Sequence, residues 1–197
     1  MKQIEVIKMQ SLSDELGHYA AARFCAPLAF FMLLRATGYL PKRLMPDKFC
    51  LNLGGKELKT GAADWSRPAL SRELRHKYSV PIVSWHLAGR EANIEKMKQA
   101  GYIETAQEAN FFLRHIFGKS VKEIVSSGYP VVVTMKPGFG TEENSNIHAV
   151  LISGWEGDKV TVFDPDARND QHIFCEDHVL AYLFEDGAGS VVLPKHS

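Results

Sequence analysis

The pattern of hydrophobic and polar positions changes character along the chain, near residue 129. Before that point apolar residues recur at helical spacing or form a long block, and after it they form short runs rich in valine and isoleucine. A period of 3.6 residues predicts helices, and short β-branched runs between turn residues predict strands. Helices followed by an antiparallel sheet are typical of an α+β domain, which is the fold class that we expect.

Residues 24–41, "FCAPLAFFMLLRATGYLP", predict a buried central helix. Pro27 suits the first helical turn, where its missing N–H is not needed, and Gly38 suits the end of the helix. The apolar residues between them cover nearly the whole helical circumference, so no face is left for solvent.

The remaining pattern predicts further helices, a loop-rich stretch and several strands. Helices are expected at residues 66–79 and 90–102, and one or two more at residues 105–128, with Gly118 as the expected break. Residues 42–64 mix Pro, Gly and charge without a sustained period and predict a loop. Strands are expected at residues 80–87, 129–137, 148–155, 158–165 and 189–195.

Composition narrows the class of protein. With 197 residues, the chain fits one domain spanning residues 1–197. Lys plus Arg equals Asp plus Glu at 23 each, so no bulk charge attracts nucleic acid or anionic membrane.

No apolar run is long enough to span a membrane and the start lacks a leader pattern, which predicts a cytoplasmic protein. An effector exported without a cleavable leader would look the same. The oligomeric state is not indicated.

Cys25 stands at the start of the predicted central helix, where chemistry and packing are both open interpretations. The chain has 3 cysteines, an odd number that suits a reducing compartment better than a disulfide framework. A helix N-terminus favours a thiolate, the nucleophilic form of cysteine. A lone cysteine beside an apolar helix is nevertheless more often a packing residue.

His148 and Asp164 supply the partners that a nucleophilic cysteine needs. His148 opens one predicted strand, residues 156–158 ("EGD") form a turn, and Asp164 closes the next strand. If the two strands pair as a hairpin, His148 and Asp164 meet at the same end. A cysteine at a helix tip facing His and Asp on a sheet is the arrangement of a Cys-His-Asp triad. Each residue alone has an ordinary structural interpretation, and their joint placement favours catalysis.

Several segments carrying these residues resemble papain-like cysteine peptidases related to the bacteriocin-processing, double-glycine leader peptidases. "CAPLAFFMLLRATGY" is similar to the family's "C-G-P-x-x-L-x-M-x-L" segment, with Ala26 where the family prefers Gly. "GYPVVVTM" resembles its "G-x-P-V-V-V" strand, and "IHAVLISGWEGDKVTVFDPD" resembles its "H-x-V-V-I-x-G…V-x-V-x-D-P" hairpin. "DWSRPALSRELRHKYSV" looks like a helix that is often found between these segments.

The resemblance implies a papain-like fold with a central buried helix packed on an antiparallel sheet. It makes Cys25 the nucleophile, His148 the base and Asp164 its orienting partner. "EVIKMQSLSDE" resembles the family's "V-P-x-x-S-Q" phrase, so Gln10 becomes the expected oxyanion donor. At the shorter spacing typical of papain, His18 and Tyr19 are the alternatives.

The function expected from these residues is hydrolysis of a peptide or amide bond through a thioester acyl-enzyme, without a cofactor or metal. The partner is then a peptide or protein substrate, or a small amide. Two alternatives stay open: an amide transferase or glutamine deamidase on the same residues, and a catalytically silent peptide-binding module. The substrate itself is not predicted, because specificity lies in loops such as residues 41–64 and 136–147.

"HIFCEDH" places His172, Cys175 and His178 at short spacing, which invites a metal-site interpretation. A closed zinc site needs a fourth ligand and a more definite cysteine pairing. Ordinary surface and strand residues are therefore the preferred interpretation.

Overall fold

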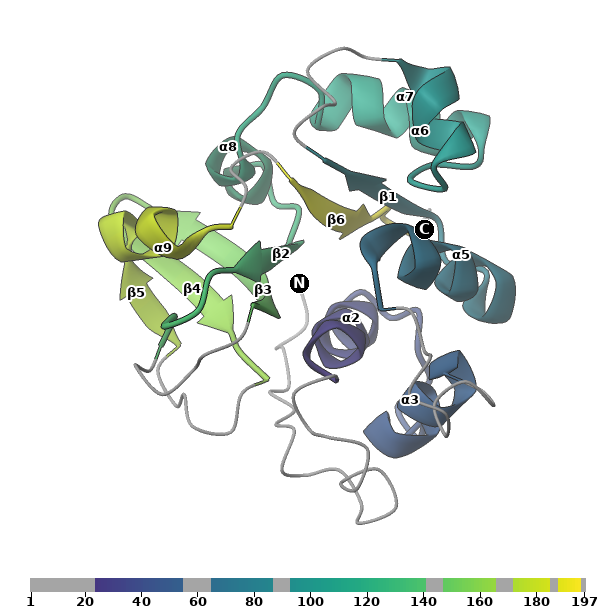
Figure 1. Ribbon diagram of the computed structural model, residues 1–197, viewed down its shortest axis with the longest axis horizontal. Coiled ribbons are helices and arrows are strands. Elements are labelled where there is room, and N and C mark those ends of the chain that lie inside the picture. The colour runs from purple at the N-terminus through teal and green to yellow at the C-terminus, as the bar shows by residue number, and fades with distance from the viewer. Residues whose placement is uncertain are drawn as a thin grey trace.

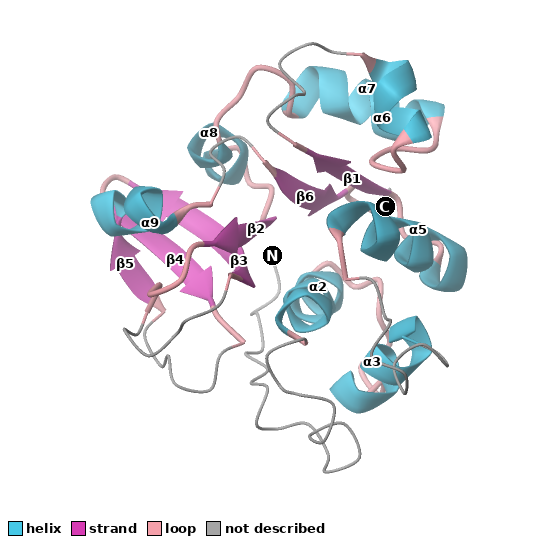
Figure 2. Cartoon of the chain, viewed as in Figure 1, coloured by secondary structure: helices cyan, strands magenta, loops and turns pink. Residues whose placement is uncertain are grey.

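The computed structural model describes residues 24–54, 65–86, 93–140, 147–165, 172–184 and 188–195 (Figure 1). Figure 2 shows where helices and strands lie along these ranges. The helices are α2 (Cys25–Ala36), α3 (Pro46–Gly54), α5 (Arg67–Tyr78), α6 (Ile94–Gln99), α7 (Ala106–His115), α8 (Val121–Ser126) and α9 (Glu176–Tyr182). The strands are β1 (Ile82–Trp85), β2 (Val131–Met135), β3 (His148–Glu156), β4 (Lys159–Phe163), β5 (Ile173–Cys175) and β6 (Gly189–Val192).

The described strands form one sheet in the order β1-β6-β2-β3-β4-β5, and every pair is antiparallel. This confirms a mixed helical and antiparallel architecture. The strand expected at residues 80–87 is β1, which comes from the helical part of the chain and pairs with β6. Local pattern carries no information about this long-range pairing.

Helices cover both faces of the sheet. In Figure 1, α2, α3 and α5 lie on one side of it, and α6 to α9 lie on the other. Alternation along the strands explains this, since Val132 and Leu151 belong to the core on the α2 side, whereas Val133 and Val150 belong to the opposite core. Both faces are therefore apolar, as expected for a sheet buried between layers.

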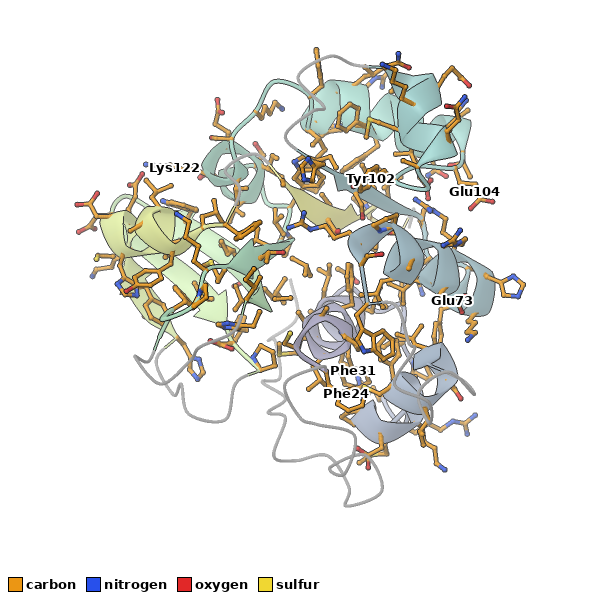
Figure 3. All side chains as sticks on the ribbon, in the orientation of Figure 1. Phe24, Phe31, Glu73, Tyr102, Glu104 and Lys122 are labelled. Carbon is orange, nitrogen blue, oxygen red and sulfur yellow. The ribbon has the colours of Figure 1, made fainter. Side chains whose placement is uncertain are left out.

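Helix α2 is the most deeply packed helix of its layer. It has 12 residues, of which 10 are buried, and they pack against sheet residues that include Ala149. Burial of each large apolar side chain contributes roughly 1.5–3 kcal/mol, so this helix is a major source of stability. The Phe31 ring lies 5.3 Å from the Phe49 ring of α3, and Figure 3 shows Phe31 on the α3 side of α2.

Two short segments differ from the predicted pattern. Helix α3 occupies part of the stretch predicted as a loop, with Pro46 in its first turn and Phe49, Cys50 and Leu53 buried. This apolar spacing is helical but too brief to stand out between Gly, Pro and charged residues. Strand β5 and helix α9 were also not predicted, because 3 and 7 residues are too few to establish a period.

A buried ion pair joins the α5 layer to the α7 layer. Arg75 Nε lies 2.9 Å from Glu108 Oε1, and the Glu108 side chain is 1% exposed. The same carboxylate accepts hydrogen bonds from the backbone N–H groups of Ile82 and Glu104. The Glu108 carboxylate of α7 thus binds α5, the start of β1 and the segment before α7.

Among the described residues, no helix is both long and apolar enough to cross a membrane.

Candidate active site

The β3–β4 hairpin brings His148 and Asp164 together. The two strands pair in antiparallel register through Leu151 and Phe163, and the turn contains Gly157 at a φ of 60°, a conformation that favours glycine. His148 Nε2 lies 3.0 Å from Asp164 Oδ2. The juxtaposition predicted from hairpin pairing is confirmed.

Both partners of this hydrogen bond are removed from solvent. The His148 side chain is 5% exposed and the Asp164 side chain is 0% exposed. Because an ionised carboxylate only accepts hydrogen bonds, Nε2–H of His148 is the donor. With that proton on Nε2, Nδ1 is the other ring nitrogen through which the imidazole can exchange a proton.

Cys25 lies beside the same end of β3. It is the first residue of α2, and its sulfur accepts a hydrogen bond from the backbone N–H of Ala149, the residue that follows His148. The charge of Asp164 also acts on the sulfur. The structure therefore gathers Cys25, His148 and Asp164 at one place, from the start of α2 and from the β3–β4 hairpin.

Burial raises the pKa of the Cys25 thiol above its ordinary value. The backbone N–H groups of Ala149, Ala26 and Cys25 itself oppose this and lower the pKa, whereas the negative charge of Asp164 raises it further. The helix terminus thus acts in the predicted direction, but burial outweighs it. A neutral thiol in this place needs a base to become a nucleophile, and His148 is the neighbouring base.

Phe139 contacts the His148 ring from the loop after β2. Its ring lies 6.1 Å from the imidazole and is fully buried, and it also packs against Phe174 at 4.8 Å. Phe139 belongs to the segment 136–147, one of the loops that were expected to carry substrate specificity. Within the described part of that segment, this residue packs near the imidazole as part of the hydrophobic core.

The other candidate residues are distributed differently. Gln10, His18 and Tyr19 lie outside the described residues. The His172 ring lies 5.8 Å from the Phe163 ring in a tilted arrangement, the His178 ring stacks on Phe174 at 5.5 Å, and Cys175 is exposed. No group of His, Cys, Asp or Glu within the described ranges is arranged to hold a metal ion.

The family model of the Peptidase_C39 like family matches residues 4–182. The chain belongs to the Peptidase_C39 like family. The match includes the positions of Gln10, Cys25, His148 and Asp164, and membership supports a cysteine peptidase as the class of protein.

This C39-like family member is also similar in fold to a solved structure. The crystal structure of a Bacillus anthracis protein named as a C39-like peptidase aligns with a TM-score of 0.53 and 13% identity. The alignment covers 99% of this chain and 96% of that chain. At this identity the similarity shows the fold alone. A search of curated proteins finds no match to this chain.

Arg67, the first residue of α5, donates a hydrogen bond to Thr134 on β2, the strand next to β3.

Proposed function

We propose that this C39-like family member is a cysteine peptidase of papain-like fold that hydrolyses a peptide or amide bond. Cys25 is the nucleophile, His148 is the general base and acid, and Asp164 orients the imidazole. The observation that carries the proposal is the buried 3.0 Å hydrogen bond between His148 and Asp164 at the end of β3 that contacts Cys25.

In the acylation step, the Cys25 sulfur attacks the carbonyl carbon of the substrate while its proton passes to His148. The oxyanion of the tetrahedral intermediate accepts hydrogen bonds from the Cys25 backbone N–H and from Gln10, the donor expected from the family pattern. Collapse of the intermediate breaks the C–N bond, and His148 returns the proton to the leaving amine. The acyl group remains on Cys25 as a thioester.

In the deacylation step, His148 removes a proton from a water molecule that attacks the thioester carbon. The C–S bond breaks, the carboxylic acid leaves, and the Cys25 sulfur recovers its proton. Asp164 supports both steps because its carboxylate selects the imidazole tautomer and stabilises the imidazolium that forms.

The buried pair also separates this proposal from a silent binding module. Burying a carboxylate and an imidazole away from water costs free energy that a binding module would have no reason to spend, which supports a catalytic role for the pair. A transferase or a glutamine deamidase shares the thioester and differs only in the acceptor or the amide attacked. Family membership favours the peptidase over both.

The test uses a peptide mixture from digested casein, with products followed by mass spectrometry and the protein quenched in acid for intact mass. We expect new peptide termini and an acyl adduct on Cys25, both absent in Cys25→Ser. The matched control is Cys175→Ser, which removes an exposed cysteine and should retain cleavage. Cleavage that persists in Cys25→Ser, or wild-type protein that neither cleaves nor acquires an adduct, contradicts the proposal.

A further inference from the structure

An open groove of about 440 Å³ lies between α7 and the segment that follows β6. This volume is within the range of about 300–1,000 Å³ that is typical of ligand pockets. In Figure 1, α7 lies on the side of the sheet away from α2. The groove is therefore separate from the candidate active site. The described residues that line it are Gln107, Asn110, Phe111, Arg114, His115, Leu193 and Pro194.

Helix α7 divides its residues between the core and the groove. Its buried residues are Glu108, Ala109 and Phe112. The residues that line the groove recur three or four positions apart between 107 and 115, and this spacing places them on one face of the helix. Since the core uses the other face, this stripe of side chains is available to a ligand.

Contacts within the protein hold both walls of the groove. The His115 ring lies 4.8 Å from the Phe111 ring and 5.3 Å from the Tyr129 ring. On the opposite wall, the Leu193 carbonyl accepts a hydrogen bond of 3.0 Å from the Tyr39 hydroxyl. A groove whose walls are already fixed loses little conformational freedom when a ligand binds.

Arg114 gives the groove a positive charge. Its side chain is exposed and, within the ranges that the structure describes, it has no hydrogen bond or ion pair. The described lining contains no acidic residue, and Glu108 of the same helix is buried and paired with Arg75. The helix dipole favours a cation in this last turn, but it leaves the N–H donors of the guanidinium without acceptors. An anionic group of a ligand is the partner that these donors fit.

We propose that this groove binds a peptide segment of the substrate that carries a carboxylate beside an apolar side chain, remote from the bond that is cut. The link to a substrate rests on the proposed function. The Arg114 guanidinium binds the carboxylate through two parallel hydrogen bonds. Phe111 and Pro194 contact the apolar side chain, and the Asn110 amide both donates to and accepts from peptide groups. A nucleic acid needs many cations along its phosphates, whereas only Arg114 is permanently charged among the described lining residues.

The first test measures binding without catalysis, in a Cys25→Ser background. The probes are fluorescein-labelled Gly-Ser octapeptides with a central Leu-Glu or Leu-Gln pair, followed by fluorescence anisotropy. We expect the Leu-Glu peptide to bind about 10-fold more tightly, and Arg114→Gln to remove this difference. Arg72→Gln, which removes an exposed arginine of α5, should bind as the background does.

Three outcomes of the binding test overturn the inference. They are an absence of binding, equal affinity for the two peptides, and equal binding by Arg114→Gln and the background. Free N-acetylglutamate is a further probe. If it competes as strongly as the unlabelled Leu-Glu octapeptide, the groove is a site for a small acid and the peptide site is overturned.

The second test separates the groove from the proposed peptidase. With cleavable peptides that carry a distal Leu-Glu pair, Arg114→Gln should raise KM about 10-fold and leave kcat and iodoacetamide labelling of Cys25 unchanged. A fall in kcat at unchanged KM overturns the inference. If binding depends on Arg114 but no peptide is cleaved, the peptidase proposal fails and the groove keeps its peptide-binding role.

Discussion

The imidazole of His148 and the carboxylate of Asp164 form a buried hydrogen bond of 3.0 Å across 16 residues of sequence. The β3–β4 hairpin makes this contact, since its antiparallel register returns the chain to the end of the sheet where it began. Cys25, the first residue of α2, lies at the same end of β3, where its sulfur contacts the backbone N–H of Ala149.

Asp164→Asn should reduce peptide hydrolysis on the order of 10²- to 10⁴-fold with little change in fold. The asparagine is isosteric but can present its NH₂ group to the imidazole, which then adopts the wrong tautomer. The substitution also removes the carboxylate charge that stabilises the imidazolium. Turnover and circular dichroism are the measurements. Asp158→Asn, an exposed residue in the turn of the same hairpin, is the matched control and should keep full activity. Equal activity of the two variants argues against an orienting role for Asp164.

His148→Ala should shift alkylation of Cys25 by iodoacetamide to higher pH. Burial and the charge of Asp164 raise the pKa of the Cys25 thiol above its ordinary value of 9.0, so little thiolate is present at pH 7. Alkylation near neutrality then depends on His148 taking the thiol proton, so the variant should label only in the alkaline range, whereas the wild type should also label near neutrality.

The measurement is the rate of Cys25 labelling from pH 5 to 10 in a Cys175→Ser background, because Cys175 is exposed and would react itself. His172→Ala serves as the control, since that histidine packs against Phe163 next to Asp164 without pairing with it. The same dependence of the labelling rate on pH in the wild type and in His148→Ala would contradict the role of His148 as the base.

Glu108→Ala should lower the free energy of unfolding by roughly 3–5 kcal/mol. The substitution leaves the buried Arg75 guanidinium without its carboxylate and removes the acceptor of the Ile82 and Glu104 backbone N–H groups. Urea denaturation measures the loss.

Glu104→Ala is the matched control for this pair. Its carboxylate is 66% exposed and lies 3.9 Å from Arg75 Nε, and Figure 3 shows it at the edge of the molecule. A surface contact of this kind contributes about 0.5 kcal/mol or less. Similar losses in both variants would mean that the Arg75–Glu108 pair does not hold the two layers together.

Stability should fall at alkaline pH because of Cys50. Burial, with a smaller contribution from the charge of Asp47, raises the pKa of the Cys50 thiol from 9.0 to about 12. The folded state therefore holds its proton more tightly than the unfolded state does, and the stabilisation, complete below pH 9, is lost as pH rises from 9 towards 12. The slope attains at most about 1.4 kcal/mol per pH unit.

Cys50→Ala removes this titration. We expect the variant to be less stable than the wild type at pH 8, because it leaves a cavity, and the difference to shrink at pH 10 and 11. Urea midpoints measured at each pH give the comparison, with Cys175→Ala as an exposed control that tracks the wild type. A difference that stays constant with pH would contradict the buried thiol's titration.

Much of the architecture could be predicted from local pattern. The central helix was expected within residues 24–41 and runs over Cys25–Ala36, and the division at Gly118 between α7 and α8 was expected from that glycine, whose φ is 74°. Long apolar blocks and turn residues determine local structure through near neighbours in the sequence, so such elements can be predicted from the sequence alone. Helices α3 and α9 were not predicted from the sequence. Short helices depend on tertiary contacts, such as that between Phe49 of α3 and Phe31 of α2, and the local hydrophobic period does not indicate such contacts.

The sequence by itself determined which residue types stand at the tip of the helix and at the two ends of the hairpin, because helix caps, turns and strand periods are local properties. Only the tertiary structure decided that Cys25 lies against Ala149, that its burial raises the thiol pKa, and that Arg67 reaches Thr134 beside it. Burial and charge at a site depend on segments brought together by long-range packing.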